Sequence, residues 1–211
     1  MSLLLTAAVV AAGLSVGRFV YWKRRARPSP SLALPLAAAP RSPIVSGPSL
    51  SGFRCKLGDV VMRAGGDEAL LAGALVLSEQ RPTAALFIAP DAAGERAIYA
   101  KLEPAPSLAW LVPVLANALG LGLAGAPPST IEFGANRFER VRRIPVRVTR
   151  LGSGTPDVGD VTTVGEYADA AGCVLLVLTG SGGAWAWTGS RLEDGMFDVL
   201  PGRDDEDDRS G

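Results

Sequence analysis

From Phe53 to about Gly202, glycine, proline and aspartate divide the chain into short apolar segments, and this spacing limits what the chain can fold into. Segments such as TAALFIAP and AIYAKL have the length of strands, and the second alternates in part between apolar and other residues. The breakers between them favour hairpins. ALLAGALVL also fits a helix, because alanine and leucine are strong helix formers. We predict a mainly β domain, either a small β-barrel or a β-sandwich.

The segment RFERVRRIPVRVTRLG continues the strand pattern and carries the densest group of positive charges in the predicted domain. Its alternation places apolar side chains on one face and mostly basic ones on the other. The apolar set is Ile144, Val146 and Val148, and the other set is Arg143, Arg147 and Thr149. Pro145 predicts an edge position or a bulge, because proline cannot donate a hydrogen bond to a neighbouring strand.

The stretch Ser107–Gly125 carries no charge and is long enough to raise the alternative of a second membrane span. Pro113 and Gly120 argue against an uninterrupted helix, and no positive cluster flanks the stretch. We expect instead a buried strand at Ala109–Val114, followed by a short helix or an apolar loop.

Two short pieces of sequence, LGDVV at Leu57 and VGDVT at Val158, both place Gly-Asp before a β-branched strand. This echo raises the alternative that the domain consists of two related halves. A Gly-Asp turn that enters a strand is common, so the echo carries little weight by itself.

The N-terminal stretch Leu3–Trp22 is uncharged apart from Arg18, and as a helix it would cross a hydrocarbon core of ~30 Å. Its positive charges follow the apolar run, whereas a cleaved export signal carries them in front. We therefore predict a transmembrane anchor over residues 1–26, with the N-terminus outside and the C-terminal domain in the cytoplasm. An inverted topology, with a periplasmic domain, is the alternative. The residues expected at the membrane interface are Arg18, Tyr21, Trp22, Lys23, Arg24 and Arg25.

Composition divides the rest of the chain. Residues 27–52 are rich in proline, alanine and serine, which predicts an extended linker. Residues 53–202 are the β-rich domain. Residues 203–211 contain the acidic run Asp204–Asp208, which predicts a disordered tail.

Composition also excludes several kinds of chemistry. The chain has no histidine, which excludes His-ligated zinc and catalysis by Ser-His-Asp or Cys-His groups. Cys55 and Cys173 are far apart and predict buried free thiols. A formal net charge of zero gives no general attraction to nucleic acid, so we expect no nucleic-acid partner. Arginine far outnumbers lysine beside abundant alanine, glycine and proline, which is typical of a GC-rich bacterial genome.

Aromatic and basic side chains in the second half of the domain form the candidate partner surface. Trp185 and Trp187 stand two residues apart, so on a strand both point to one face and could form a platform; core packing is the alternative. The arginine-rich segment could face anionic lipid, nucleic acid or solvent. The candidate surface is Trp185, Trp187, Tyr167, Arg143 and Arg147.

No catalytic or cofactor signature is present in the sequence. The glycines of LTGSGGAWAWTG lack the spacing of a phosphate-binding loop and indicate a turn. Carboxylates lie scattered near predicted strand ends, and a catalytic pair around Asp160 and Glu166 is the alternative hypothesis. The scattered set is Asp59, Asp160, Glu166 and Glu193. We expect a protein that is not an enzyme and that uses no cofactor or metal.

The pieces LGDVV, AWLVPV, FERVRRIPVRV, GEYADAAG and AWTGSRLEDG occur in that order between Phe53 and Leu200. They resemble a family of uncharacterised bacterial β-rich proteins known only as a domain of unknown function. Members tend to be encoded among membrane-associated and envelope-stress genes, so the resemblance implies an accessory role at the membrane. The N-terminal anchor and the lack of a cysteine-rich zinc module set this chain apart from many members. The resemblance implies no activity and no site residue.

These observations lead to a functional hypothesis. The chain is expected to be a single-pass protein of the bacterial inner membrane, attached to the bilayer through Leu3–Trp22. Its cytoplasmic β domain is expected to bind a protein partner as an adaptor or accessory subunit of a membrane assembly. The alternative is a small-ligand sensor or a carboxylate-based enzyme on the same anchored domain.

Overall fold

The computed structural model describes residues 50–90, 94–121 and 127–202. The predicted anchor with its interface residues, the linker up to residue 49 and the acidic tail all lie outside the described residues. Within the described ranges, no helix is both long and apolar enough to cross a bilayer. The elements are β1 (Val60–Arg63), β2 (Glu68–Leu70), β3 (Gly73–Ser78), β4 (Pro82–Ala89), β5 (Arg96–Lys101), β6 (Ser107–Val114), the 3-10 helix η1 (Ala116–Leu119), β7 (Thr130–Phe133), β8 (Asn136–Gly152), β9 (Val161–Ala168), β10 (Cys173–Gly180), β11 (Gly183–Leu192) and β12 (Phe197–Leu200).

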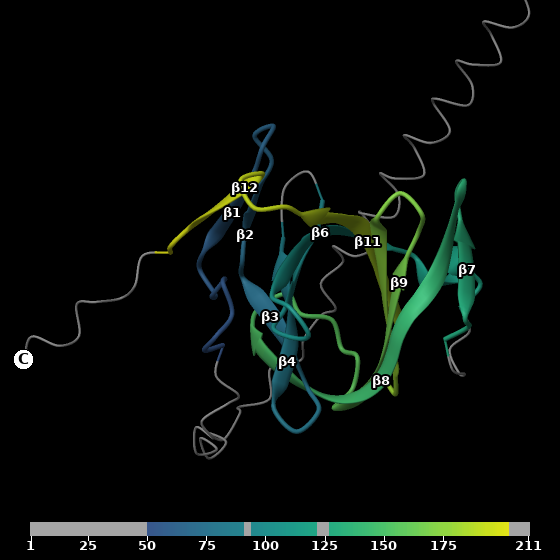
Figure 1. Ribbon diagram of the computed structural model, residues 1–211. Coiled ribbons are helices and arrows are strands. Elements are labelled where there is room, and N and C mark those ends of the chain that lie inside the picture. The colour runs from purple at the N-terminus through teal and green to yellow at the C-terminus, as the bar shows by residue number, and fades with distance from the viewer. Residues whose placement is uncertain (1–49, 91–93, 122–126, 203–211) are drawn as a thin grey trace, which may run out of the picture. The chain divides into compact units, whose positions relative to one another are not determined.

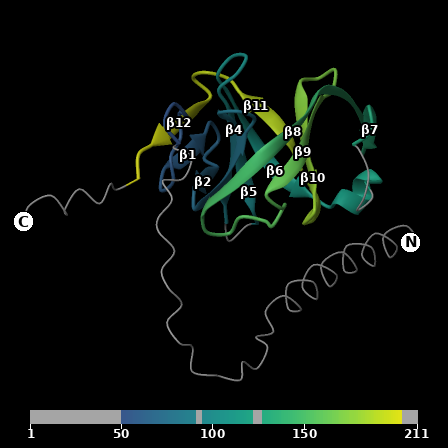
Figure 2. The ribbon, with the colours of Figure 1, turned by 90° about the horizontal axis from the view of Figure 1, so that it is seen from below.

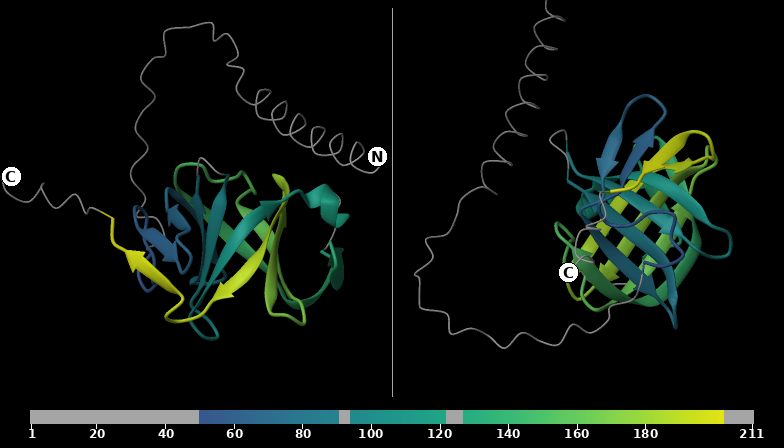
Figure 3. Two further views of the ribbon diagram at one scale, coloured as in Figure 1. Left: turned by 90° about the horizontal axis from the view of Figure 1, so that it is seen from above. Right: turned by 90° about the vertical axis from the view of Figure 1, so that its left-hand side faces the viewer.

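Eight strands close into an antiparallel barrel in the order β3-β4-β5-β6-β11-β10-β9-β8 (Figure 1). Two four-stranded meanders, β3 to β6 and β8 to β11, are joined by the pairings β6–β11 and β3–β8. Figure 3 shows this closed ring from two further directions. The domain is therefore mainly β, as predicted, and the closure decides between the barrel and the sandwich.

The strand β8 extends beyond the barrel wall. It pairs with β7 at residues 136–139, with β9 at 139–147 and with β3 at 147–152. One edge of residues 140–146 therefore pairs with neither β7 nor β3. Pro145 lies in this stretch, so the predicted edge position is confirmed.

The barrel interior is a packed core and not a channel. Alternate side chains from all eight strands point inward and touch one another, as the strand period requires. Val158, in the loop between β8 and β9, adds its buried side chain to the same cluster. The interior cluster includes Leu75, Leu77, Leu86, Ile88, Leu111, Val146, Val148, Val164, Leu176, Leu178 and Trp187.

Two further layers cover the outside of the barrel on opposite sides (Figure 1, Figure 2). On one side, the sheet β12-β1-β2 packs with its own apolar face against the outward side chains of β3 to β6. On the other side, β7 and η1 cover outward side chains of β9, β10 and β11. The fold therefore has three apolar clusters, one inside the barrel and one beneath each outer layer.

The carboxylate of Asp59, just before β1, connects the two ends of the described domain. Its Oδ2 accepts a hydrogen bond from the backbone N–H of Lys56 at 2.7 Å, and its Oδ1 accepts one from that of Gly202 at 3.1 Å. Asp59 is buried, so both bonds form away from bulk water. The Gly-Asp turn of LGDVV is a structural element of the domain.

The two Gly-Asp sequences occupy different places in the fold. LGDVV leads into β1 of the outer sheet, whereas VGDVT leads into β9 of the barrel wall. In two related halves, β9 would correspond to β4 and not to β1. The echo therefore does not mark equivalent positions of a duplication.

Two local predictions are decided by the strand bounds. The ALLAGALVL segment forms the end of β2 and most of β3, so the helical alternative is wrong. The strand expected at Ala109–Val114 is confirmed as β6, which begins at Ser107, and the short helix after it is η1. Residues 122–126 of this stretch lie outside the described residues.

Both cysteines are free, and Cys55 is completely buried whereas Cys173 is half-buried. Burial raises the pKa of Cys55 from 9.0 to about 11, with a smaller contribution from the charge of Asp59.

The burial of Cys55 is expected to make stability depend on pH. The thiol ionises at a lower pH in the unfolded chain than in the folded one, so the free energy of unfolding falls between pH 9 and pH 11. We expect a loss of about 2 kcal/mol from this group. Urea unfolding at a series of pH values would measure it, and Cys55→Val should show a shallower decline; an identical decline would contradict this origin.

Candidate functional site

One end of the barrel carries a hydrogen-bonded group that crosses the interior from wall to opposite wall. Tyr99 and Lys101 point inward from β5, and Glu166 points inward from β9, four strands away around the ring. The Tyr99 hydroxyl donates to Glu166 Oε1 at 2.8 Å, and Lys101 Nζ donates to Glu166 Oε2 at 2.6 Å. These three residues are the polar bridge.

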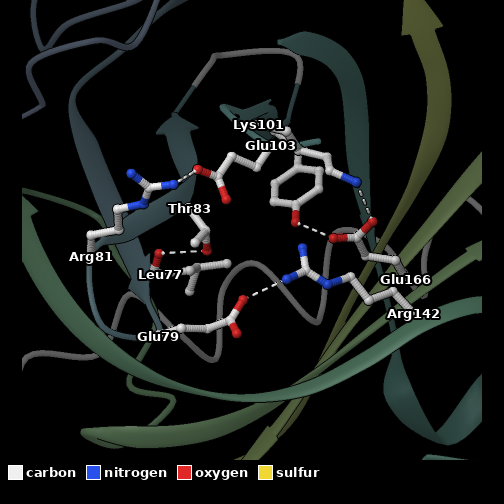
Figure 4. A network of polar contacts seen from close by, with 9 residues as sticks. Leu77, Glu79, Arg81, Thr83, Lys101, Glu103, Arg142 and Glu166 are labelled. Atoms are coloured by element: carbon white, nitrogen blue, oxygen red, sulfur yellow. Dashed lines mark hydrogen bonds and ion pairs between the residues drawn. The ribbon is translucent and has the colours of Figure 1, made fainter. Parts of the chain in front are cut away.

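Two further ion pairs surround the polar bridge at the same end (Figure 4). Arg142, on β8, pairs with Glu79, which follows β3. Arg81 pairs with Glu103, which follows β5. These four side chains are far more exposed than Glu166, which keeps 9% of its side-chain surface. The barrel end thus has a buried carboxylate at its centre and solvated ion pairs at its rim.

Burial fixes the protonation state of the tyrosine in the polar bridge. It raises the pKa of Tyr99 well above the ordinary value of 10, and the charge of Glu166 and its hydrogen bond act in the same direction. Tyr99 is therefore a neutral donor at neutral pH. Glu166, with two donors on its two oxygens, is the acceptor of both bonds.

The space beside the polar bridge is small. A cavity of about 50 Å³ lies against it, lined in part by Val141, Ser107 and Arg191. That volume holds a few water molecules, because a cavity needs roughly 10–15 Å³ to hold one. The arrangement can order water and hold charge, but a cavity of this volume is too small for an organic substrate.

The carboxylates singled out in the sequence do not meet. Asp160 is exposed and lies six residues before Glu166 along the β9 segment, a separation of about 20 Å. Glu193 is exposed at the end of β11, and Asp59 is committed to the backbone of Lys56 and Gly202. In the described ranges no group of three or more metal-ligating side chains comes together either.

A larger hollow lies on the outside of the barrel, over β6 and β11. It measures about 320 Å³, near the lower end of the range of roughly 300–1,000 Å³ typical of ligand pockets. We call it the outer groove. Two rows of neighbouring side chains form its floor: Arg96, Val112 and Thr188 in one, and Trp110, Ser190 and Cys173 in the other.

The turns at the two ends of the outer groove belong to different outer layers. Arg63 is the last residue of β1 and Asp67 immediately precedes β2, whereas Asn136 is the first residue of β8 after the β7–β8 turn. The outer groove thus has an apolar centre, where Val112 keeps 36% of its surface, and two guanidinium groups at Arg63 and Arg96. Gly189, between Thr188 and Ser190, lines the groove with its backbone alone, because this position pairs with Leu111 and faces the barrel interior.

A third feature is a row of arginines on the outward face of β8. Arg140, Arg143 and Arg147 lie on the same outward face, because their partners on β9 are the outward positions Tyr167, Gly165 and Val161. We call these three residues the arginine row. Arg140 donates to the backbone carbonyl of Pro127 at 2.9 Å.

The structure removes two members of the predicted partner surface from solvent. Trp187 keeps 1% of its surface and lies inside the barrel, and Tyr167 keeps 1% and packs beneath the β7 layer. Trp185 points the same way as Trp187, as expected, and packs half-buried against the interior cluster. Both indoles therefore stand at inward-facing strand positions. Because Trp187 is buried, the pair cannot form an exposed platform. Arg143 and Arg147 remain exposed on β8.

Sequence reasoning missed residues that the fold brings to these sites. Lys101 could have been found, because it is the sole charge in the inward half of the alternating run AIYAKL. Arg63 and Arg96 could not, since nothing in the sequence shows that the β1–β2 turn and the start of β5 lie at the same groove.

Comparison with known proteins adds no assignment: no family model, no curated protein and no solved structure matches the chain. The resemblance to a bacterial domain of unknown function therefore stays a prediction.

Proposed function

We propose that the protein is a single-pass adaptor of the bacterial inner membrane whose cytoplasmic barrel domain binds a protein partner in the outer groove. The anchor at residues 1–26, the linker and the cytoplasmic location rest on the charge order of the sequence. The observation that carries the binding function is the outer groove itself, a hollow of about 320 Å³ between two structural layers.

The chemistry of the outer groove points to a partner with apolar and acidic side chains. Val112 offers apolar contact at the centre, whereas Trp110 is buried in the floor, and desolvated apolar contacts supply most of the energy at protein interfaces. Arg63 and Arg96 offer bidentate donors for a carboxylate. The Ser190 hydroxyl can bond to a partner backbone, and the Thr188 hydroxyl, which donates to the backbone carbonyl of Val174 at 3.2 Å, can accept from a partner N–H.

The alternative of a small-ligand sensor or carboxylate enzyme has less support. Its proposed pair, Asp160 and Glu166, lies about 20 Å apart along one strand segment. The cavity beside Glu166, at about 50 Å³, is of water size. An adaptor needs neither a converging pair nor a deep pocket.

A photo-crosslinking experiment in native membranes would test the adaptor function. A photoreactive phenylalanine derivative at Val112, in the outer groove, is expected to give one dominant crosslinked protein. The same residue at Leu70, an exposed apolar site on the outer sheet, is the matched control and should give several-fold less of it.

A second variant tests whether the groove chemistry causes the crosslink. Arg63→Glu together with Arg96→Glu is expected to reduce the Val112 crosslink at least tenfold, because two charge-assisted contacts become repulsive. Equal crosslinking from Val112 and Leu70, or a crosslink that survives the charge reversal, would contradict the proposed function.

A further inference from the structure

We propose that the arginine row, with its flanking outward face of β8 and β9, binds the anionic headgroups of the lipid bilayer and thereby sets how the barrel lies on the membrane. The inference rests on the membrane attachment within the proposed function, but not on the partner or on the outer groove.

The geometry of the row suits a flat, charged surface. Arg143 and Arg147 are four residues apart on one strand face, a span of about 13 Å, so the two guanidinium groups can contact separate headgroups of an extended surface. Their partners on β9, Gly165 and Val161, have no polar side chain that would compete with lipid phosphate for the guanidinium groups. Val161 keeps 62% of its surface, so an apolar side chain stands exposed beside Arg147.

Ion pairing separates the row from the other arginines of the same strand. Arg137 lies 4.0 Å from Glu139, Arg142 pairs with Glu79, and Arg150 lies 3.1 Å from Asp157. In the described part of the chain, neither Arg143 nor Arg147 has such a carboxylate partner. The strand thus neutralises arginines elsewhere along its length and leaves positive charge on one outward face.

The length of the linker allows this face to reach the bilayer. Residues 27–49 separate the predicted anchor and its basic flank from the first described residue, and they span at most roughly 80 Å. A linker of this length allows any face of the barrel to approach the lipid. The distribution of charge on the barrel then decides which face binds, and the anchor raises the local lipid concentration so that a weak interaction suffices.

The expected effect of each arginine is modest and measurable. A basic side chain near an anionic bilayer strengthens binding by about fivefold, so removal of both Arg143 and Arg147 is expected to weaken it by about thirtyfold. The attraction is screened by salt within a Debye length of ~10 Å at 0.1 M. We expect no electrostatic attraction between this face and a bilayer of neutral phosphatidylcholine.

Vesicle sedimentation would test the barrel without the predicted anchor. A chain that begins at residue 45 retains the whole compact unit with its three apolar clusters. We expect it to bind vesicles of 30% phosphatidylglycerol in phosphatidylcholine, and not vesicles of phosphatidylcholine alone. Arg143→Gln with Arg147→Gln should lose about thirtyfold in affinity. Arg54→Gln with Arg81→Gln, two exposed arginines outside the row, is the matched control and should bind as the parent does.

Labelling of the full chain in nanodiscs would map the bound face. In a Cys173→Ser background, Val161→Cys should react several-fold more slowly with an impermeant maleimide in the phosphatidylglycerol discs than in phosphatidylcholine discs. Leu70→Cys should react equally in both. The double glutamine variant and 0.5 M salt should each restore the faster rate at position 161.

Three outcomes would overturn the proposal. The first is equal sedimentation with both lipids, and the second is binding that survives the double substitution. The third is slow labelling at 161 in both lipids that becomes fast when residues 203–211 are removed, since the acidic tail would then occupy the row. The Val112 crosslink is unaffected by any of these, so the lipid contact and the adaptor function can fail separately.

Discussion

Trp187→Ala is expected to lower the free energy of unfolding by about 4 kcal/mol, because truncation of a buried tryptophan leaves a large cavity. Trp187 keeps 1% of its surface and touches the interior cluster, whose members are fixed by pairing on all sides of the barrel. The walls cannot collapse into the vacated space without breaking the closed ring. Urea unfolding followed by circular dichroism would measure the loss.

Trp187→Phe distinguishes the contribution of volume from that of polarity. The indole N–H of Trp187 is buried and has no hydrogen-bond partner among the described residues. Phenylalanine removes that donor and keeps most of the ring, so we expect a loss of about 1 kcal/mol or less. A Trp187→Ala protein that is as stable as the parent but has lost the Val112 crosslink would contradict the core role of Trp187 and favour a role in partner binding.

The second large effect is expected at the polar bridge. Glu166→Ala removes the acceptor of both Tyr99 and Lys101, whose side chains are mostly buried, and should cost about 3–5 kcal/mol. The cost arises mainly because the ammonium of Lys101 then lacks a counter-charge in a poorly solvated place. Thermal unfolding at neutral pH, with the fitted enthalpy, would give the value.

A triple substitution is the sharper test of this reading. Tyr99→Phe, Lys101→Met and Glu166→Leu together replace the bridge by apolar groups of similar volume, and we expect stability within about 1 kcal/mol of the parent. Glu103→Ala, in the exposed pair with Arg81, should cost about 0.5 kcal/mol or less. A triple variant as unstable as Glu166→Ala would contradict the interpretation that the cost of Glu166→Ala arises from the unpaired charge of Lys101.

Much of the barrel is predictable from local sequence, because each strand carries its own pattern. Short apolar runs between glycines and prolines identified the strands, and Pro113 with Gly120 correctly argued against a second span. The closure was not predictable. It depends on the pairings β6–β11 and β3–β8, which join residues far apart in sequence and leave no mark on either strand alone.

The candidate sites show the same limit. Period-two alternation predicted that Trp185 and Trp187 share a face, but it does not say whether that face is the inside or the outside of a barrel. The outward orientation of Arg143 and Arg147 was predictable for the same reason as the inward orientation of Val146. The outer groove was not, since it is assembled from two turns and the outer faces of neighbouring strands.

The Asp59 carboxylate, which holds Lys56 and Gly202 together, has a consequence for how the chain could be rewired. The domain begins and ends at one place, so its backbone is close to a continuous circle. A short peptide between Gly202 and the start of the domain would complete that circle, and new ends could be opened at a surface turn such as Gly134. The same closed barrel could thus form from a chain whose strands are synthesised in a different order.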